Sequence, residues 1–150
     1  MKATKVFPLN TFPAYRYVVT LSRMNGQWLF SRHRGRDTWE TQGGHIEPGE
    51  TPEQAARREL WEESGAEEYT LTPVCDYWSC DDQSSAVGVA FLAEITRLGP
   101  LPDFEMEELR TFDALPEQVT YPHITPLLVE AVEAFMASPG GFRLPEAGKP

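Results

Sequence analysis

The sequence predicts an α/β protein in which a mixed β-sheet is covered by a helix on each face. Two observations indicate this class. Six segments rich in β-branched and aromatic residues interleave with two segments of helical character. In addition, residues 86–93 form a continuous apolar run, which is typical of a strand covered on both faces. The chain has 150 residues, enough for one domain with a proper apolar core and too few for two ordinary domains.

We expect three parts along the chain. Residues 1–14, which are broken by Pro8 and Pro13, are expected to be an irregular N-terminal segment. Residues 15–137 form a single domain, and residues 138–150 form a loose C-terminal tail. The expected strands are 15–21, 27–31, 39–41, 69–78, 85–95 and 108–112, and the expected helices are 52–64 and 122–137.

Turn and capping residues mark the first hairpin and the first helix. Asn25 and Gly26 stand between two strand segments and favour a tight hairpin turn. Thr51 and Gln54 have the spacing of a capping box, in which the Thr caps the helix and the Gln side chain reaches back to the cap. Gly65 is a suitable left-handed terminator. These signals predict where the helix begins and ends.

The charge balance limits the classes of partner. The chain has 23 acidic and 13 basic residues, a net charge of −10, and a surface this acidic repels phosphate backbones. We therefore expect no nucleic-acid polymer as partner. No apolar run approaches the roughly 20 residues of a spanning helix, and the N-terminus has no secretory signal. We expect no membrane partner and a cytoplasmic location, with Cys75 and Cys80 as reduced thiols.

One face of the first helix carries three glutamates. Glu59, Glu62 and Glu63 stand at positions i, i+3 and i+4, so their side chains project from the same face. Arg58 can serve Glu62, but no basic residue lies three or four positions from Glu59 or Glu63. These two carboxylates are expected to need positive charge from elsewhere. Carboxylate ligands favour Mg²⁺ or Mn²⁺, whereas a merely solvated acidic face is the alternative interpretation.

The residues around this face complete a longer pattern, G-x₅-E-x₇-R-E-U-x-E-E-x-G-U, in which U is apolar. Its fixed positions are Gly44, Glu50, Arg58, Glu59, Glu62, Glu63 and Gly65. With this complete box at residues 44–66, the chain resembles the MutT-like Nudix hydrolases. The resemblance implies an α/β/α sandwich with a mixed sheet between helices. It also implies hydrolysis of a nucleoside diphosphate derivative by metal-assisted attack of water on phosphorus, with Mg²⁺ or Mn²⁺ as cofactor.

The resemblance also assigns roles within the box. Glu62 and Glu63 would be metal ligands, and Glu59 would be a further ligand or the general base that takes the proton of the water. Glu50 and Arg58 would form a supporting pair that holds the preceding loop against the helix. All five are therefore candidate catalytic residues.

Three further positions are implied around the box. The carbonyl of Gly43 is a plausible extra metal ligand, and Gly44 would let the backbone approach the substrate closely. A later acidic loop would contribute Glu105 as a metal ligand, with Glu107 and Glu108 as alternatives. At residue 42 the chain departs from the family pattern: Gln42 stands where Pro is common, which affects the rigidity of the loop and a possible substrate contact.

Substrate-binding candidates come from the segment before the box. Arg32, Arg34 and Arg36 form the densest basic cluster of the chain and could clamp phosphates, because guanidinium groups suit phosphate oxygens. A solvated basic loop is the alternative. Trp39 could stack on a base, although packing in the core is the more common use of such an aromatic residue.

The compact chain is most similar to MutT-type enzymes, which hydrolyse nucleoside triphosphates, including oxidised purine nucleotides, to a monophosphate and pyrophosphate. Alternative substrates are ADP-ribose, a nucleotide sugar or a dinucleoside polyphosphate. Two other functions stay open: a non-catalytic nucleotide sensor and isoprenoid diphosphate isomerisation. We expect a small-molecule nucleotide as partner, and a monomer or a homodimer.

Overall fold

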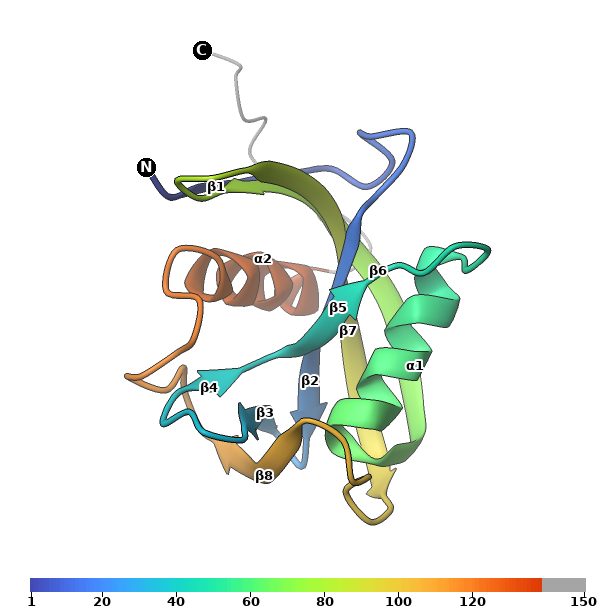
Figure 1. Cartoon of the computed structure of the whole chain (residues 1–150). Helices are drawn as coiled ribbons and strands as arrows, with labels where there is room; N and C mark the ends of the chain where they lie inside the picture. Colours follow the sequence, from blue (N-terminus) through green and yellow to red (C-terminus); the bar gives the residue numbers. More distant parts are fainter. Residues whose placement is uncertain (139–150) are drawn as a thin grey trace.

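A mixed eight-stranded sheet lies between two helices in the computed structural model, which describes residues 1–138 (Figure 1). The strand order is β1-β6-β7-β2-β3-β4, with β5 paired to β2 and β8 paired to β3. The elements are β1 (Ala3–Phe7), β2 (Tyr17–Met24), β3 (Gln27–His33), β4 (Trp39–Glu40), β5 (Gln42–His45), α1 (Pro52–Ser64), β6 (Ala66–Cys80), β7 (Ser85–Leu98), β8 (Met106–Phe112) and α2 (Thr125–Ala137).

The two helices cover opposite faces of the sheet, as the separate apolar clusters show. On one face α1 buries Ala55, Ala56 and Leu60 against the sheet. On the other face α2 buries Leu128 and Val132, together with apolar side chains of β2, β3, β6 and β7. Figure 1 shows α1 and α2 on the two sides of the central strands. The predicted α/β sandwich is therefore confirmed.

The central strand β2 brings the motif loop onto the sheet. It pairs in parallel with β7 along one edge, and its other edge is shared by two antiparallel partners. β3 pairs with the second half of β2, whereas β5 pairs with the first half, where Val19 lies opposite Gly43 and Val18 opposite Gly44. This division places the two glycines in the sheet beside α1. The position of the motif loop thus depends on the start of β2.

Local signals predicted the hairpin and α1 correctly. Asn25 and Gly26 have positive φ angles of 52° and 77°, as a tight turn between β2 and β3 requires. Thr51 accepts a hydrogen bond from the Gln54 amide, and the Gln54 side chain accepts one from the Thr51 amide. Gly65 ends α1 in the left-handed conformation with a φ of 77°.

The structure differs from the expectation in the N-terminal segment. Residues 1–14 were expected to be irregular, but Ala3–Phe7 forms strand β1, which pairs with the end of β6 from Ala3↔Cys80 to Phe7↔Asp76. The residues that pair with this strand lie 69 to 77 positions away, so local sequence did not reveal it. The expected tail at 138–150 lies outside the described residues, apart from Ser138.

Two other boundaries also differ. The expected strand at 39–41 is divided into β4, which pairs with β3, and β5, which pairs with β2. The second helix begins at Thr125 rather than at residue 122, because residues 121–124 form a turn in which the Tyr121 carbonyl accepts from the Ile124 and Thr125 amides. Neither α1 nor α2, the helices of the part of the chain that is described, has the length and apolarity to cross a bilayer.

Candidate active site

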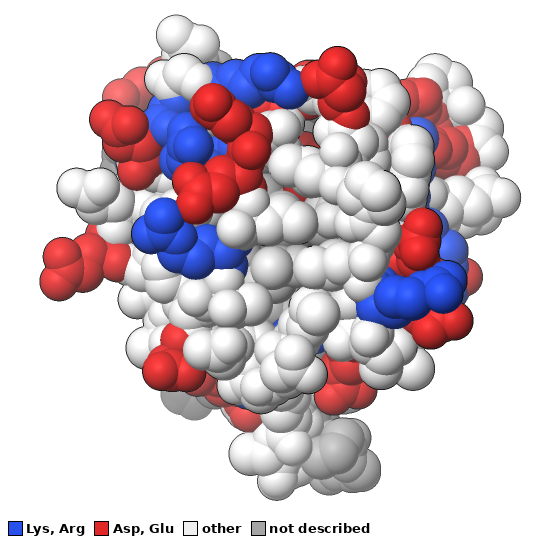
Figure 2. Space-filling model, turned by 90° about the horizontal axis from the view of Figure 1, so that it is seen from below, with Lys and Arg blue, Asp and Glu red and all other residues white. Residues whose placement is uncertain are grey.

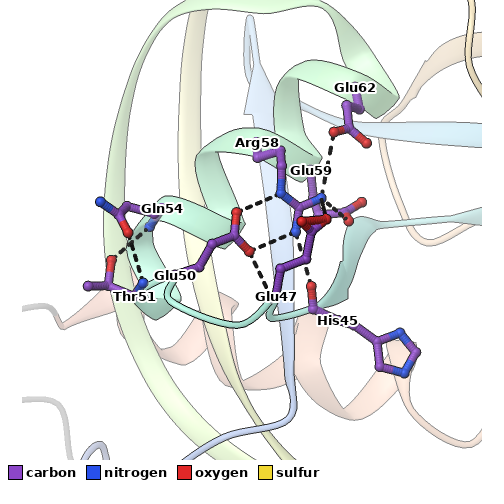
Figure 3. Close-up of polar contacts among 8 residues, drawn as sticks. All are labelled: His45, Glu47, Glu50, Thr51, Gln54, Arg58, Glu59 and Glu62. Carbon is purple, nitrogen blue, oxygen red and sulfur yellow. Dashed lines mark hydrogen bonds and ion pairs between the residues drawn. The ribbon is translucent and has the colours of Figure 1, made fainter.

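Arg58 holds the loop before α1 against the helix (Figure 3). Its Nε and Nη2 atoms donate to the two carboxylate oxygens of Glu50 at 2.7 and 2.9 Å, a bidentate geometry, and Nη2 also donates to the His45 carbonyl. Hydrogen bonds from Arg58 and from the Glu47 amide lower the pKa of Glu50 to about 2. The supporting pair that the resemblance implied is thus present as a contact.

Arg58 also contacts the acidic face of α1. Its Nη1 lies 2.7 Å from Glu59 Oε1 and 3.6 Å from Glu62 Oε2. The expectation that Glu59 has no local cation was wrong, because a long guanidinium can turn back to the adjacent residue as well as to positions three or four away. Burial nevertheless raises the pKa of Glu59, and the nearby Arg58 only partly opposes that effect.

Glu63 is in a different situation from its neighbours. Its Oε1 accepts a hydrogen bond of 2.7 Å from the Gly43 amide, and among residues 1–138 no Lys or Arg forms an ion pair with it. Burial, together with repulsion from Glu59, Glu40 and Glu105, raises the pKa of Glu63 to about 9. The residue also lies in the last turn of α1, which has no basic residue and where the helix dipole disfavours a negative charge.

The paired glycines allow the backbone to approach these carboxylates. A Cβ atom added at Gly44 would lie 2.7 Å from Glu59 Oε1, and one added at Gly43 would overlap the Val18 carbonyl of β2. Side chains at both positions would therefore displace either Glu59 or the strand. Glycine is required here because of close packing between β5, β2 and α1.

Glu105 joins the glutamates of α1 in one pocket. The pocket has a volume of about 260 Å³. Its walls are formed by Gly43, Gly44, His45, Glu47, Glu59, Glu62, Glu63, Phe104 and Glu105. We call it the acidic pocket. Glu105 lies 39 positions beyond residue 66, the end of the motif, and the fold brings it to the pocket through the loop that precedes β8.

A larger cavity of about 520 Å³ adjoins the acidic pocket. Gly43, Gly44 and His45 line both spaces, so the cavity continues from the acidic pocket across β5. Tyr17 and His45 form an aromatic pair in its wall, with ring centroids 4.5 Å apart. No local signal in the sequence indicates this pair, because Tyr17 and His45 become neighbours only through the pairing of β2 with β5.

The acidic pocket has the donor chemistry of a divalent metal site. In residues 1–138 no three His, Cys, Asp or Glu side chains converge as a ready coordination shell, because Glu59 turns to Arg58 and Glu63 to the Gly43 amide. The donors are all carboxylate or carbonyl oxygens, which suit Mg²⁺ or Mn²⁺. In addition, Glu63 is a half-buried carboxylate without a paired cation in the described residues, and a bound ion would compensate its negative charge. These residues therefore fit such an ion.

The basic cluster lies beside the pocket and makes contacts with carboxylates. Arg32 pairs with Glu107 and Glu108, Arg34 with Asp103, and Arg36 with Glu40. Neither the acidic pocket nor the larger cavity is lined by any of the three arginines. The structure thus does not bring this cluster together with the glutamates of the box, and its guanidinium groups are already engaged by acidic side chains.

Trp39 belongs to the core. Its side chain is 8% exposed and packs edge-on against Phe112, with ring centroids 5.2 Å apart, while Arg110 lies over the indole ring. It lines neither cavity. Its burial in the apolar cluster against α2 favours the packing interpretation of Trp39 over stacking on a base.

Gln42 occupies the position where the family pattern commonly has Pro. It is fully buried, its Oε1 accepts from Ser22, and its Nε2 donates to the Ser31 hydroxyl and the Leu29 carbonyl. The Ser31 hydroxyl in turn donates to the Glu63 carbonyl at 2.8 Å. Gln42 therefore links β2 and β3 to the last turn of α1, and its burial excludes the substrate contact considered above.

The comparisons with known proteins agree with this geometry. A family model described as the NUDIX domain matches residues 12–127, so the chain belongs to the Nudix hydrolase family. The sequence is 33% identical over 106 residues to "Putative 8-oxo-dGTP diphosphatase YtkD" of Bacillus subtilis (strain 168), covering 70% of this chain and 66% of that protein. It is 41% identical over 54 residues to the RNA pyrophosphohydrolase of Tolumonas auensis, covering 36% and 31%.

Among solved structures, the crystal structure of the Bacillus subtilis pyrophosphohydrolase BsRppH (E68A mutant) superposes with a TM-score of 0.74 at 23% identity. The superposition covers 93% of each chain. At this identity the likeness establishes the fold. The chain spans 66% of YtkD and about a third of the Tolumonas protein, so their activities bear on this chain only as proposals.

Proposed function

We propose that the protein is a metal-dependent pyrophosphohydrolase that cleaves a nucleoside triphosphate to a monophosphate and pyrophosphate, oxidised purine nucleotides included. The observation that carries this proposal is Glu63, a half-buried carboxylate that no cation pairs with among the described residues, in the wall of an acidic pocket that the Nudix motif forms. The name of the relative from Bacillus subtilis, "Putative 8-oxo-dGTP diphosphatase YtkD", supports the substrate class. Mg²⁺ or Mn²⁺ is the proposed cofactor.

Each residue of the pocket has a proposed part in the reaction. Glu62, Glu63 and Glu105, with the Gly43 carbonyl, would hold the ion, which when bound neutralises charge on the phosphate oxygens and activates water. Glu59 would be a further ligand or the general base. Its raised pKa favours proton transfer nearer neutral pH. Glu50 fixes Arg58 and thereby the loop that carries Gly44, which would face the substrate.

The larger cavity is the proposed place for the nucleoside. Its volume of about 520 Å³ is within the roughly 300–1,000 Å³ of ordinary small-molecule sites. It meets the acidic pocket at Gly43 and Gly44, so a nucleotide could place its phosphates at the glutamates and its base beside Tyr17 and His45. The arginines of the basic cluster have no place in this arrangement as phosphate ligands.

The RNA pyrophosphohydrolases among the relatives make the 5′-triphosphate end of an RNA a second candidate. The charge distribution favours the free nucleotide. On the face shown in Figure 2, Lys and Arg lie directly beside Asp and Glu, and the whole chain has a net charge of −10. A polyanion gains little from such a surface.

A screen of the purified protein with Mg²⁺ or Mn²⁺ tests the proposal. Nucleoside triphosphates, 8-oxo-dGTP, ADP-ribose, a nucleotide sugar, a dinucleoside polyphosphate and a 5′-triphosphorylated RNA would be compared, with Glu63→Gln as the inactive control. We expect pyrophosphate release from a nucleoside triphosphate that requires the ion and Glu63. Binding of a nucleotide without turnover would instead indicate a sensor, and preference for the RNA would replace the substrate class.

A further inference from the structure

We infer that Arg34 is a positioning residue that fixes the loop carrying Glu105 at the rim of the acidic pocket, an inference that rests on the proposed function. Arg34 holds three consecutive residues. Its amide donates to the Glu105 carbonyl at 2.9 Å, its Nε donates to the Phe104 carbonyl at 3.3 Å, and its Nη2 donates to Asp103 Oδ1 at 2.7 Å. The neighbouring His33 contacts the Glu105 carboxylate, with Nε2 and Oε2 3.2 Å apart.

The other side of the same loop is attached to α1 and β8. The Phe104 ring packs edge-on against Trp61 of α1 at a centroid distance of 6.0 Å, although both side chains are about half exposed. Met106, the first residue of β8, is buried and lies opposite His33 in the sheet. The loop is therefore held between β3 and the helix that carries the motif glutamates.

Electrostatics explains why this loop needs an anchor. The Glu105 side chain is 72% exposed, and its charge contributes to the raised pKa of both Glu59 and Glu63. Without a bound cation, the loop that carries Glu105 and the acidic face of α1 repel each other. Arg34 supplies positive charge and directional hydrogen bonds to the loop, and these keep Glu105 beside the other carboxylates. Because the loop is already ordered, ion binding then costs less conformational entropy.

This role differs from that of a phosphate clamp. A clamp would need the guanidinium free to face the cavity, whereas both side-chain donors of Arg34 that the structure places are directed to the 103–104 segment. A positioning residue acts before substrate is present. Removal of the Arg34 side chain should therefore weaken metal binding even without substrate. This decrease in affinity should occur only when Glu105 is present.

The experiment is a double-mutant cycle on Mn²⁺ affinity, measured by electron paramagnetic resonance without substrate. It compares the wild type with Arg34→Ala, Glu105→Gln and the double variant. Arg97→Ala is the matched control, since Arg97 is a similarly exposed arginine paired with Glu67 and Glu68 on β6. We expect Arg34→Ala to weaken binding about two- to fivefold, as for an exposed ion pair, and to have no further effect in the Glu105→Gln background.

The outcomes separate the two proposals. If the wild type binds Mn²⁺ but Arg34→Ala binds it as tightly, or if the two substitutions act additively, the positioning role is overturned and the proposed function stands. If Glu105→Gln leaves the affinity unchanged, the inference is also overturned. If the wild type binds no Mn²⁺ at millimolar concentration, the proposed function fails, and the inference fails with it. Thermal unfolding of each variant verifies that the fold persists.

Discussion

The two ends of α1 show opposite uses of a carboxylate within one motif. Just before the helix, Glu50 receives two hydrogen bonds from Arg58, and its pKa is lowered to about 2. In the last turn, Glu63 receives a single amide hydrogen bond, and its pKa is raised to about 9. A carboxylate whose charge is compensated stabilises the local structure. A buried carboxylate whose charge is not compensated is available for a ligand.

The arginines likewise differ in whether they contact the glutamates of the site. Arg58 belongs to the site because it connects Glu50 with Glu59 and lies at the edge of the acidic face (Figure 3). Arg32 at the end of β3 and Arg34 in the loop after it instead pair with carboxylates of β8 and of the loop before β8. Position in the fold, rather than density of positive charge along the sequence, decides which guanidinium serves the pocket.

The largest expected effect is the loss of activity in Glu63→Gln. The amide keeps the shape of the side chain but cannot hold a divalent ion as a carboxylate does, so metal-dependent turnover should fall by at least about a hundredfold. The fold should persist, since Gln has nearly the same shape as the protonated Glu63 side chain and its Oε1 can still accept from the Gly43 amide. Turnover and denaturant unfolding measure the two effects, and a wild-type rate would refute the role of Glu63.

The matched change at the other end of α1 is Glu50→Gln, which should reverse this pattern. It breaks the bidentate pair with Arg58, so we expect a clear loss of stability and a smaller loss of turnover, about tenfold. The stabilising contribution of Glu50 should be present above its unfolded pKa and lost as pH falls toward 2, because its folded pKa is depressed. Equal loss of turnover in both variants would remove the distinction between the two ends.

An effect on activity of similar size, but with a smaller effect on stability, is expected for Gly44→Ala. The added methyl would lie 2.7 Å from Glu59 Oε1, so the Glu59 side chain must move out of its position in the pocket. We expect turnover to fall roughly tenfold with little change in stability. Steady-state kinetics with chemical denaturation tests this expectation, which a variant with unchanged turnover would contradict.

The smallest effect on chemistry is expected for Gln42→Leu. The change leaves the buried Ser22 hydroxyl and Leu29 carbonyl without their Gln42 contacts, and it frees Ser31, which donates to the Glu63 carbonyl. An unsatisfied buried polar group costs about 1–3 kcal/mol of unfolding free energy. Denaturant unfolding should show this loss, and an unchanged unfolding midpoint would contradict it. Thr70→Val, at an exposed position of β6, is the neutral control.

Elements that depend on neighbours in sequence were predictable. The capping residues of α1, the Asn25-Gly26 turn and the spacing of the motif glutamates are local, and the structure has α1 with the predicted bounds. Strand β1 depends on a partner in β6 and was missed. The same reason explains Trp39, which only the packing of β4 against β8 and α2 places in the core.

The candidate site likewise has residues that local sequence predicted and residues that it did not. The glutamates of α1 follow from their spacing on a helix, and the choice of Glu105 came from the family resemblance rather than from a local signal. Tyr17, His45 and the Gln42 network could not be predicted, because β2 and β5 are brought together only by the register of the sheet. The state of charge of Glu63 likewise depends on burial beneath β5.

The central claim is that Glu63 holds a divalent ion whose charge replaces a proton. Calorimetric titration with Mg²⁺ at pH 7, repeated in buffers of different ionisation enthalpy, measures both the affinity and the protons released. Because its pKa is about 9, Glu63 is mainly protonated at pH 7 without metal, so binding should release about one proton per ion. The release should vanish in Glu63→Gln. Tight binding with no proton released in the wild type, or binding unchanged in Glu63→Gln, would contradict the account.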